Sequence, residues 1–439
     1  MTSRDYFKGK RIAVIGLDPH GEMVEDVKFL IKAGALVSVY DLKSEARLKH
    51  HLVFLRTVGL ANYVCSSIPA DDLLDMDMIV LSHEYTRDSS FLKEVIKKGI
   101  PIEYPETLFF KKAPPVTVIG IMGVCGKATV MSMLEPMLSN ICASIEGQGF
   151  FVIDSETGDG IVAYLKKIKS GDIVLMRITE SMMKELASIG ISPHVAVFTT
   201  IPTKGSYVST PFEILANQTY NNFIIGNDEI IDIIYSSKTQ PKAKMLRTKP
   251  SIVPVDWGLG NQSNHDRDNA SLAIQVARLF KVDDDVIKRV LDGWKSLKGR
   301  LELIKKIKDV EFYNDSASVS AMSTIAAIKS LSVNRNLILV FGGSMTMDDY
   351  RPLYSLLHKY VHTVVLLPGS GTLRERPFIQ GLDNITVCSS PSVEEAANIA
   401  NEHTHRGDRV IFSPGFQAVG ADGSRKSRGE RFIKAVRAL

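Results

Sequence analysis

The stretch VTVIGIMGVCGKAT at residues 116–129 contains the sharpest local signal in this chain. Its first seven residues are mostly apolar and predict a buried strand, and VMSMLEPML at 130–138 continues with a helical pattern. Between them, Gly123 and Gly126 let backbone amides approach phosphate oxygens, and Lys127 can reach the β- and γ-phosphates. The stretch therefore predicts a nucleotide-phosphate cradle. The alternative is a glycine-rich strand-to-helix turn that binds no ligand.

The residue after the lysine departs from the standard phosphate-loop pattern. That pattern has Ser or Thr directly after the lysine, where its hydroxyl ligates magnesium, whereas this chain has Ala128. Thr129 comes one position later, and because a helix turns about 100° per residue, its hydroxyl cannot simply replace the missing ligand. The loop is therefore expected to bind phosphate without its usual magnesium hydroxyl.

Apolar runs typical of buried parallel strands alternate with helical patterns along almost the whole chain, which predicts α/β layers with crossover helices. Three units can be separated, at residues 1–112, 115–298 and 299–439. The first two are divided by KKAPP at 111–115, where two prolines cannot continue a helix. We expect three α/β domains: an N-terminal Rossmann-like domain, a central P-loop parallel sheet and a smaller C-terminal Rossmann-like domain. The predicted strands lie at 10–16, 37–41, 75–82, 100–104, 116–122, 172–178, 194–200, 310–315, 336–343, 362–369, 384–388 and 409–415.

Composition excludes several classes of protein. The 439 residues are 45% hydrophobic and 23% charged, with a net charge of only +4, so a disordered chain and a nucleic-acid-binding surface are not expected. No run reaches the roughly 18 apolar residues of a membrane span, and the start has no signal-peptide pattern, so we expect a cytoplasmic protein. The four cysteines, Cys65, Cys125, Cys142 and Cys388, are widely spaced and are expected to be thiols.

A second, weaker loop signal is GLDPHG at 16–21, at the first strand-to-helix turn. Asp41 ends the next strand, a spacing that suits the pyrophosphate of a nucleotide and its ribose or base. However, Asp18 stands where an anion-binding loop favours glycine. A Rossmann-like domain that binds nothing remains the alternative.

The two loops, in this order and about 100 residues apart, resemble the Mur ligases, most closely the type that joins D-glutamate to UDP-N-acetylmuramoyl-L-alanine. The resemblance covers nearly the whole chain. Further stretches are similar to family motifs in the correct order: HDRDN at 265–269, LKGRLE at 297–302, YNDS at 313–316, VFGG at 340–343, SPG at 413–415 and RG at 428–429.

The resemblance implies an ATP-dependent ligase that phosphorylates a carboxylate and lets an amine attack the acyl phosphate to form an amide. It implies a UDP-sugar on the first domain, ATP on the second and an amino acid brought by the third. The loop residues Gly123, Gly126, Lys127, Ala128 and Thr129 would bind the phosphates. The resemblance also implies that Asn269, Arg300 and Asp315 bind the adenosine end of ATP, and that Ser413 binds the carboxylate of the amino acid. Asp41 would bind the uracil end of the UDP-sugar, and Gln148 would contact the substrate.

Each of these roles has a structural alternative. Asp315 could cap a strand end, Arg300 could form a surface ion pair worth less than about 1 kcal/mol, and Asn269 could be a residue at a helix start. The joint order of the motifs favours the inherited roles.

The departures from the family lie in its metal-binding and catalytic positions. The resemblance aligns Arg177 with a metal-binding glutamate, Thr203 and Lys204 with an Asp-His pair, and Asn217 with a carbamylated lysine. Thr346 replaces the lysine of another family motif, and Gln148 stands where a substrate-contacting asparagine is expected. The resemblance implies magnesium, but its ligands are expected to be lost in this chain, and no metal site is predicted.

Three functions stay open. The first is the ligase itself, in peptidoglycan precursor synthesis, with Arg177 and Lys204 acting as fixed cations in place of magnesium. The second is a catalytically degenerate paralogue that binds nucleotide or regulates an intact Mur ligase. The third is ligase chemistry on another substrate. Expected partners are a nucleotide, a UDP-sugar and an amino acid, but no nucleic acid or membrane.

Overall fold

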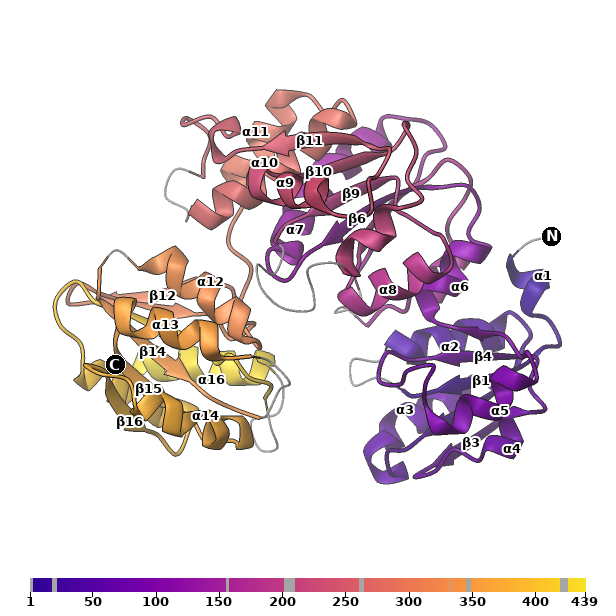
Figure 1. Ribbon diagram of the computed structural model, residues 1–439, viewed down its shortest axis with the longest axis horizontal. Coiled ribbons are helices and arrows are strands. Elements are labelled where there is room, and N and C mark those ends of the chain that lie inside the picture. Colours follow the sequence, from indigo (N-terminus) through magenta and orange to yellow (C-terminus); the bar gives the residue numbers. More distant parts are fainter. Residues whose placement is uncertain are drawn as a thin grey trace. The chain divides into compact units, whose positions relative to one another are not determined.

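Three β-sheets flanked by helices make up the part of the chain that the structure describes (Figure 1). The structure is a computed structural model, and it describes residues 3–17, 22–154, 158–200, 210–259, 264–332, 334–344, 349–418 and 425–439. The chain divides into two compact units, of which one contains the first two sheets and the other contains the third sheet together with residues 124–129 and 253–270. The expected α/β fold class is confirmed. The expected domain boundaries stay predictions.

The N-terminal sheet is parallel, with the strand order β3-β2-β1-β4-β5. Its strands are β1 (Arg11–Ile15), β2 (Leu36–Asp41), β3 (Asn62–Cys65), β4 (Met78–Leu81) and β5 (Ile102–Glu103). Its helices are α1 (Ser3–Phe7), α2 (Glu22–Lys32), α3 (Glu45–Thr57), α4 (Ala70–Leu73), α5 (Lys93–Lys97) and α6 (Pro105–Lys112). Alternate residues of β1 contribute to two apolar cores on opposite faces of the sheet, as the period of a strand requires.

The central sheet is also parallel, with the order β11-β10-β9-β6-β8-β7. Its strands are β6 (Thr117–Met122), β7 (Phe150–Ile153), β8 (Ile173–Arg177), β9 (Val195–Phe198), β10 (Phe223–Asn227) and β11 (Lys244–Thr248). The α-helices of this part are α7 (Lys127–Ala143), α8 (Glu180–Ser188), α9 (Asp228–Ser236), α10 (Asn264–Leu279) and α11 (Asp284–Gly293).

The C-terminal sheet has the order β12-β13-β17-β14-β15-β16 and is parallel except for the hairpin of β12 and β13. Its strands are β12 (Glu302–Ile307), β13 (Val310–Asn314), β14 (Leu337–Phe341), β15 (Val361–Leu366), β16 (Thr386–Ser389) and β17 (Arg409–Phe412). Its helices are α12 (Ala321–Leu331), α13 (Arg351–Tyr360), α14 (Ser370–Gln380), α15 (Val393–Glu402) and α16 (Arg425–Ala438). Residues of α12 and α13 pack on one face, and residues of α15 and α16 pack on the other.

Five strands were not predicted from the sequence: β3, β7, β10, β11 and β12. Four of them lie at sheet edges, where strands are short or half exposed and the apolar signal is weak. The β12–β13 hairpin turns at Lys308 and Asp309, which have φ of 45° and 67°. Two residues with positive φ are typical of a type I′ turn, but this turn usually contains Asn or Gly. The sequence therefore carried no ordinary hairpin signal here.

Helix α2 is joined to the central part of the same unit by a buried carboxylate. Asp26 is 1% exposed, and its oxygens accept hydrogen bonds from the backbone N–H groups of Ile161 (3.3 Å) and Ala163 (2.9 Å). These two residues lie at the start of the 3₁₀ helix η2 (Val162–Lys166). One apolar core continues from the N-terminal sheet into the central sheet around this contact. The carboxylate therefore fixes the junction by satisfying backbone donors that burial removes from water.

Replacing Asp26 with alanine is expected to lower the free energy of unfolding by about 3 kcal/mol, because two backbone donors lose a charged acceptor in a buried place. Urea unfolding followed by circular dichroism measures this change. Glu25→Ala is the matched control, since Glu25 contacts Lys28 at 2.9 Å on the surface and should cost less than about 1 kcal/mol. Equal losses in the two variants would contradict the role given to Asp26.

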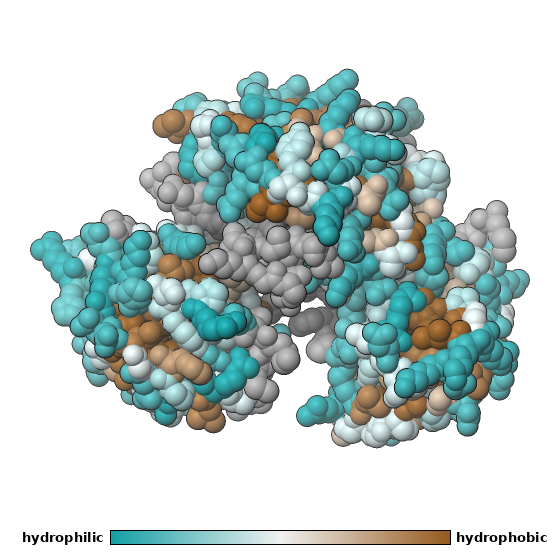
Figure 2. All heavy atoms as spheres, in the orientation of Figure 1, coloured by the Kyte–Doolittle hydropathy of each residue, from teal (hydrophilic) through white to brown (hydrophobic). Residues whose placement is uncertain are grey.

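Hydrophilic residues cover most of the visible face of the molecule, with apolar residues in small separate groups (Figure 2). Within the described ranges, no helix combines the length and the apolar character that crossing a bilayer requires.

Candidate functional site

The glycine loop, residues 123–126, joins the carboxyl end of β6 to the first residue of α7. Gly123 has a φ of +125°, and a Cβ added there would lie 2.4 Å from Thr199 Oγ1 and 2.7 Å from the Thr200 carbonyl oxygen. Gly126 has a φ of +87°. Because a side chain at Gly123 would collide with the chain that follows β9, this position requires glycine. The loop lies at the carboxyl edge of a parallel sheet, where open α/β folds bind ligands.

Lys127 opens α7, a helix of 17 residues whose amino end faces the glycine loop. Its ammonium group donates a hydrogen bond to the Val124 carbonyl oxygen at 3.2 Å, so the charge lies over the loop. Backbone N–H groups, the helix dipole and this ammonium group together form an arrangement that suits phosphate oxygens. Ala128 adds no hydroxyl, and Thr129 is 8% exposed in the first turn.

Arg177 is the last residue of β8, and it pairs in register with Ile121 of β6, so it lies beside the strand that leads into the glycine loop. The side chain is 4% exposed and forms an ion pair with Asp154, which directly follows β7. Arg177 Nε lies 2.6 Å from Asp154 Oδ1, and Nη2 donates to Oδ2 at 2.8 Å. The expected basic residue is thus at the carboxyl edge, but a carboxylate neutralises it. The ion pair therefore does not present a bare positive charge that would repel a metal ion.

Magnesium prefers oxygen ligands, above all carboxylates. Next to the glycine loop the described residues offer the Asp154 carboxylate, which Arg177 already binds, and the hydroxyls of Thr129 and Thr199. No group of three metal-ligating side chains occurs there among the described residues. This donor set does not fit a magnesium site. Thr203, Lys204 and Thr346 lie outside the described residues.

Asp315 and Ser413 meet at the carboxyl edge of the C-terminal sheet, where β13 and β17 are neighbours. Ser413 Oγ donates to Asp315 Oδ2 at 2.7 Å, and Ser318 Oγ donates to the same oxygen at 2.5 Å. The Leu301 backbone N–H donates to Oδ1 at 3.2 Å. Asp315 is 4% exposed, and burial raises its pKa to about 6 against the lowering effect of these bonds. Asp315 therefore accepts hydrogen bonds from donors near the strand end, as the structural alternative predicted.

Cys125 of the glycine loop lies within electrostatic range of Lys127, Asp315 and Arg300, all in the same compact unit. Burial is the main cause that raises the pKa of its thiol to about 11, while the two cations lower it. Three residues that the sequence linked to nucleotide binding thus gather around one loop residue. A thiol with this pKa stays protonated and unreactive near neutral pH.

Asn269 is buried inside α10, five residues after the helix starts at Asn264. It is 1% exposed, and its Nδ2 is without a hydrogen-bond partner among the described residues. The alternative of a helix-start residue is therefore wrong. A buried amide donor without a partner costs free energy, so it fits a residue that binds a ligand group.

Asp41 ends β2 at the carboxyl edge of the N-terminal sheet and is completely buried. Its carboxylate accepts hydrogen bonds from the backbone N–H groups of Leu17 and Lys43, both at 2.8 Å, and from the Tyr85 hydroxyl at 3.3 Å. The carboxylate therefore fixes the loop after β1. Next to it, Ser82 Oγ is buried without a partner in the described part of the chain.

Two residues that the resemblance links to the family's site lie at the opposite edge of the central sheet. Gln148 precedes β7, and its Nε2 donates to the Gly171 carbonyl oxygen at 3.0 Å, just before β8 begins. Asn217 is exposed near Gly190, which follows α8. Both positions belong to the amino-terminal edge of the central sheet, whereas the glycine loop lies at the carboxyl edge. The strands that begin after them, β7 and β10, were not predicted, so the edge could not be assigned.

Sequence reasoning also missed functional candidates. Asp154, Ser82 and Thr199 each directly follow a strand at the carboxyl edge of its sheet. For Ser82 and Thr199 the strands were predicted, so the rule that ligands bind at the carboxyl edge could have identified both residues. Asp154 was hidden because β7 was not recognised.

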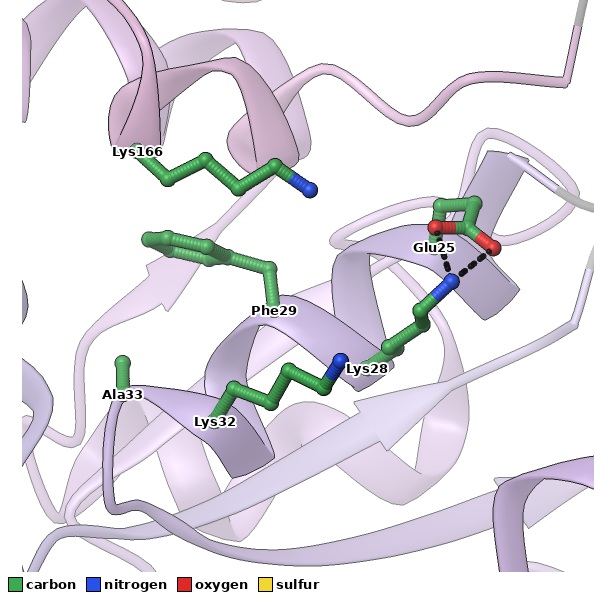
Figure 3. Close-up of a pocket in the computed structure, with 6 residues that line it drawn as sticks. All are labelled: Glu25, Lys28, Phe29, Lys32, Ala33 and Lys166. Atoms are coloured by element: carbon green, nitrogen blue, oxygen red, sulfur yellow. Dashed lines mark hydrogen bonds and ion pairs between the residues drawn. The ribbon is translucent and has the colours of Figure 1, made fainter. Parts of the chain in front are cut away.

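A separate small hollow lies between α2 and η2 (Figure 3). Its volume is about 40 Å³, which suits water or a small ion but not a nucleotide. Lys28 Nζ contacts both Glu25 oxygens at 2.9 Å. The residues that line it are Glu25, Lys28, Phe29, Lys32, Ala33 and Lys166.

Replacing Asp315 with asparagine is expected to flatten the pH dependence of stability. Because its folded pKa of about 6 exceeds the ordinary 3.8, the native state binds the proton more tightly, so the free energy of unfolding falls as the pH rises from about 4 to about 6. The loss should be of order 3 kcal/mol, and the neutral amide removes it. Urea unfolding at several pH values measures the difference. The surface variant Asp383→Asn should keep the wild-type profile, and a fall of equal size in Asp315→Asn would contradict the expectation.

No protein-family model matches the chain. In sequence it is 27% identical to the UDP-N-acetylmuramoylalanine–D-glutamate ligase of Clostridioides difficile (strain 630), over 98% of this chain and 99% of that protein. It is also 27% identical to the ligase of the same name from Streptococcus pyogenes, over 97% of this chain and 96% of that protein. The expected resemblance to the Mur ligases is confirmed.

Solved structures share the fold. The UDP-N-acetylmuramate-alanine ligase MurC of Thermotoga maritima matches with a TM-score of 0.55 and 14% identity, covering 98% of this chain and 99% of that chain. MurF ligase from Thermotoga maritima, solved in complex with ADP, matches with a TM-score of 0.55 and 15% identity, covering 99% of this chain and 96% of that chain. At these identities the likeness concerns the fold.

Proposed function

We propose that this chain, a relative of the Mur ligases in sequence and fold, is an ATP-dependent ligase that joins D-glutamate to UDP-N-acetylmuramoyl-L-alanine in peptidoglycan precursor synthesis. The observation that carries the proposal is the full-length similarity to ligases of that name, together with a glycine loop and Lys127 at the carboxyl edge of the central sheet.

ATP fits the glycine loop. Gly123 lets the loop backbone lie against the chain that follows β9, and the amino end of α7 and Lys127 provide positive charge for a polyphosphate. When bound, ATP supplies the phosphoryl group that activates the carboxylate of the sugar-linked L-alanine. Lys127 neutralises charge on the phosphates, which is the main way that proteins assist phosphoryl transfer. The amino group of D-glutamate then displaces phosphate, leaving ADP, phosphate and an amide.

The other domains supply the remaining binding groups. Asp41 holds the loop after β1, where we place the uracil end of the UDP-sugar, and Ser82 Oγ offers a buried hydroxyl beside it. In the C-terminal domain we assign Ser413 to the amino-acid carboxylate. We assign Arg300 and Asp315 of this domain, together with Asn269 of α10, to the adenosine end. Asn269 has the strongest support, because its Nδ2 is buried without a partner among the described residues.

The described residues beside the glycine loop do not fit a magnesium site, so no step is assigned to a protein-bound metal. The phosphates of ATP can bring magnesium with them. We infer a cytoplasmic enzyme whose partners are ATP, a UDP-sugar and an amino acid.

The test is phosphate release by the purified chain with ATP, magnesium, UDP-N-acetylmuramoyl-L-alanine and D-glutamate. We expect phosphate and a new amide product, detected by mass spectrometry, only when all substrates are present. L-Glutamate in place of D-glutamate is the matched substrate control. Binding of ATP by calorimetry without any product would favour the degenerate paralogue instead, and product from another amino acid would favour the third hypothesis.

A further inference from the structure

Three metal-ligating side chains gather in the C-terminal domain, at the edge of the sheet opposite to Ser413. His362 is the second residue of β15, Asp408 directly precedes β17, and His405 lies in the loop between α15 and β17. One ligand atom from each of the three lies within 4.8 Å of the other two. The sequence analysis did not single out any of these residues.

The Asp408 carboxylate is the centre of the cluster. Its Oδ2 lies 3.1 Å from His362 Nε2 and 3.4 Å from His405 Nδ1. The side chain of Asp408 is 8% exposed, that of His362 21% and that of His405 81%. The cluster therefore has a buried carboxylate at its inner end and one exposed ligand at the surface, where an ion could enter.

Local backbone structure orients both histidines. The pairing of β14 with β15 passes from Leu337–Val361 to Ile338–Thr363, so the register shifts at His362, as in a β-bulge. Bulges commonly redirect a side chain. His362 Nδ1 lies 2.9 Å from Thr363 Oγ1, which leaves Nε2 toward Asp408. A hydrogen bond on the second nitrogen is the usual support of a metal-binding imidazole.

A tight turn holds His405 against Asp408. The Asp408 N–H donates to the His405 carbonyl oxygen at 3.1 Å, and the His405 N–H donates to Asp408 Oδ2 at 2.6 Å. Gly407 supplies the positive φ of this turn, at +87°. The two residues are therefore fixed at short range by the backbone and not only by their side chains.

The neighbouring arginines bind other carboxylates. Arg406 Nε donates to Asp309 Oδ2 at 2.8 Å, and Arg409 Nε donates to Glu311 Oε2 at 3.0 Å. The ion pairs of Asp408 itself are with the two histidines. The Asp408 carboxylate therefore faces two imidazole groups. A neutral imidazole competes only weakly with a metal cation for a carboxylate.

We propose that His362, His405 and Asp408 bind one divalent transition-metal ion such as Zn²⁺, with water completing the coordination. Two imidazole nitrogens and a carboxylate are ligands that suit zinc, nickel and copper, whereas magnesium and calcium prefer oxygen alone. Nitrogen and oxygen atoms around one tetrahedral zinc lie about 3.3 Å apart, given bonds of about 2.0 Å. The exposed His405 ring can rotate to close the longest separation.

The site does not depend on the proposed ligase function. Asp408 and Ser413 lie at opposite ends of β17, a strand of four residues, so the cluster is about 13 Å or more from the residues assigned to substrate. Variants of His405 should therefore keep the ligase activity measured without added zinc. Failure of the metal site and failure of the ligase proposal are separate results.

The test is titration of the full chain, purified without a histidine tag, with ZnCl₂ in a calorimeter near pH 7.5. We expect one saturable site, with affinity at least about tenfold weaker in His362→Gln and in His405→Gln. His403→Gln is the matched control, because this histidine lies in the same loop but its Nε2 contacts Cys388 Sγ at 3.2 Å. Affinity should also fall as the solution is made more acidic, since metal binding competes with protons for the ligands.

Cobalt(II) provides a second measurement, because tetrahedral coordination by the protein gives it a visible absorption much stronger than that of the hydrated ion. The proposal is overturned if wild type shows no saturable heat, or if His405→Gln binds zinc as tightly as wild type. It is also overturned if His403→Gln loses affinity as much as His405→Gln, since the ligand set would then be a different one. His405 is exposed, so loss of folding should not obscure the comparison.

Discussion

Lys127→Ala is expected to lower phosphate release by at least about 100-fold, the effect of removing one charged group aimed at a developing negative charge. The Lys127 ammonium lies over the glycine loop, at hydrogen-bond distance from the Val124 carbonyl oxygen. Steady-state kinetics with ATP, the UDP-sugar and D-glutamate measure the loss.

The control for this variant is Lys97→Ala, which removes an exposed lysine that pairs with Glu94 on α5. It should leave the rate unchanged. Circular dichroism of Lys127→Ala should match wild type, because the side chain packs at the surface of the loop. A rate within threefold of wild type would contradict the assignment of the glycine loop as the ATP site.

Arg177→Met is expected to lower the free energy of unfolding by about 3 kcal/mol or more, because the Asp154 carboxylate would stay partly buried after losing its partner. Arg177 Nη2 donates to Asp154 Oδ2 at 2.8 Å, and the two side chains are 4% and 15% exposed. Removing one member of a buried pair is costly even where the pair itself adds little net stability. Urea unfolding measures the change.

A double-mutant cycle separates the loss of the ion pair from the cost of leaving the Asp154 charge without its arginine. Arg177→Met with Asp154→Asn should regain much of the stability lost in the single variant, since the uncompensated charge is gone. The surface variant Arg278→Met, which loses an exposed pair with Asp284, should cost less than about 1 kcal/mol. If Arg177→Met costs no more than this control, the arginine is not a structural partner of Asp154, and its charge could instead serve the phosphates.

The central correction concerns direction along the strands. Gln148 and Asn217 were assigned to the site by their resemblance to family motifs, yet each precedes a strand and lies at the amino-terminal edge. β7 has only four residues, and three of them are half-buried, so its pattern is too short and too weak to be identified. Without that strand, the position of Gln148 relative to the glycine loop could not be known.

In the C-terminal sheet, the strands that carry the motif residues were predicted, but the contact between those residues was not. Asp315 and Ser413 are 98 residues apart, and both follow strands that the apolar pattern identified. That they form a hydrogen bond depends on β13 and β17 being neighbours, which the strand order alone decides. The sequence predicted both strand ends but not their contact.

Local chemistry in the chain determined the three α/β layers and the glycine loop, because apolar periodicity and the conformational freedom of glycine act over a few neighbouring residues. Only the tertiary structure decided that Arg177 is neutralised by Asp154 and that His362, His405 and Asp408 meet. The Arg177–Asp154 and His362–Asp408 pairs join residues 23 and 46 positions apart, and they arise from the order in which strands assemble. No property of the individual residues specifies that order.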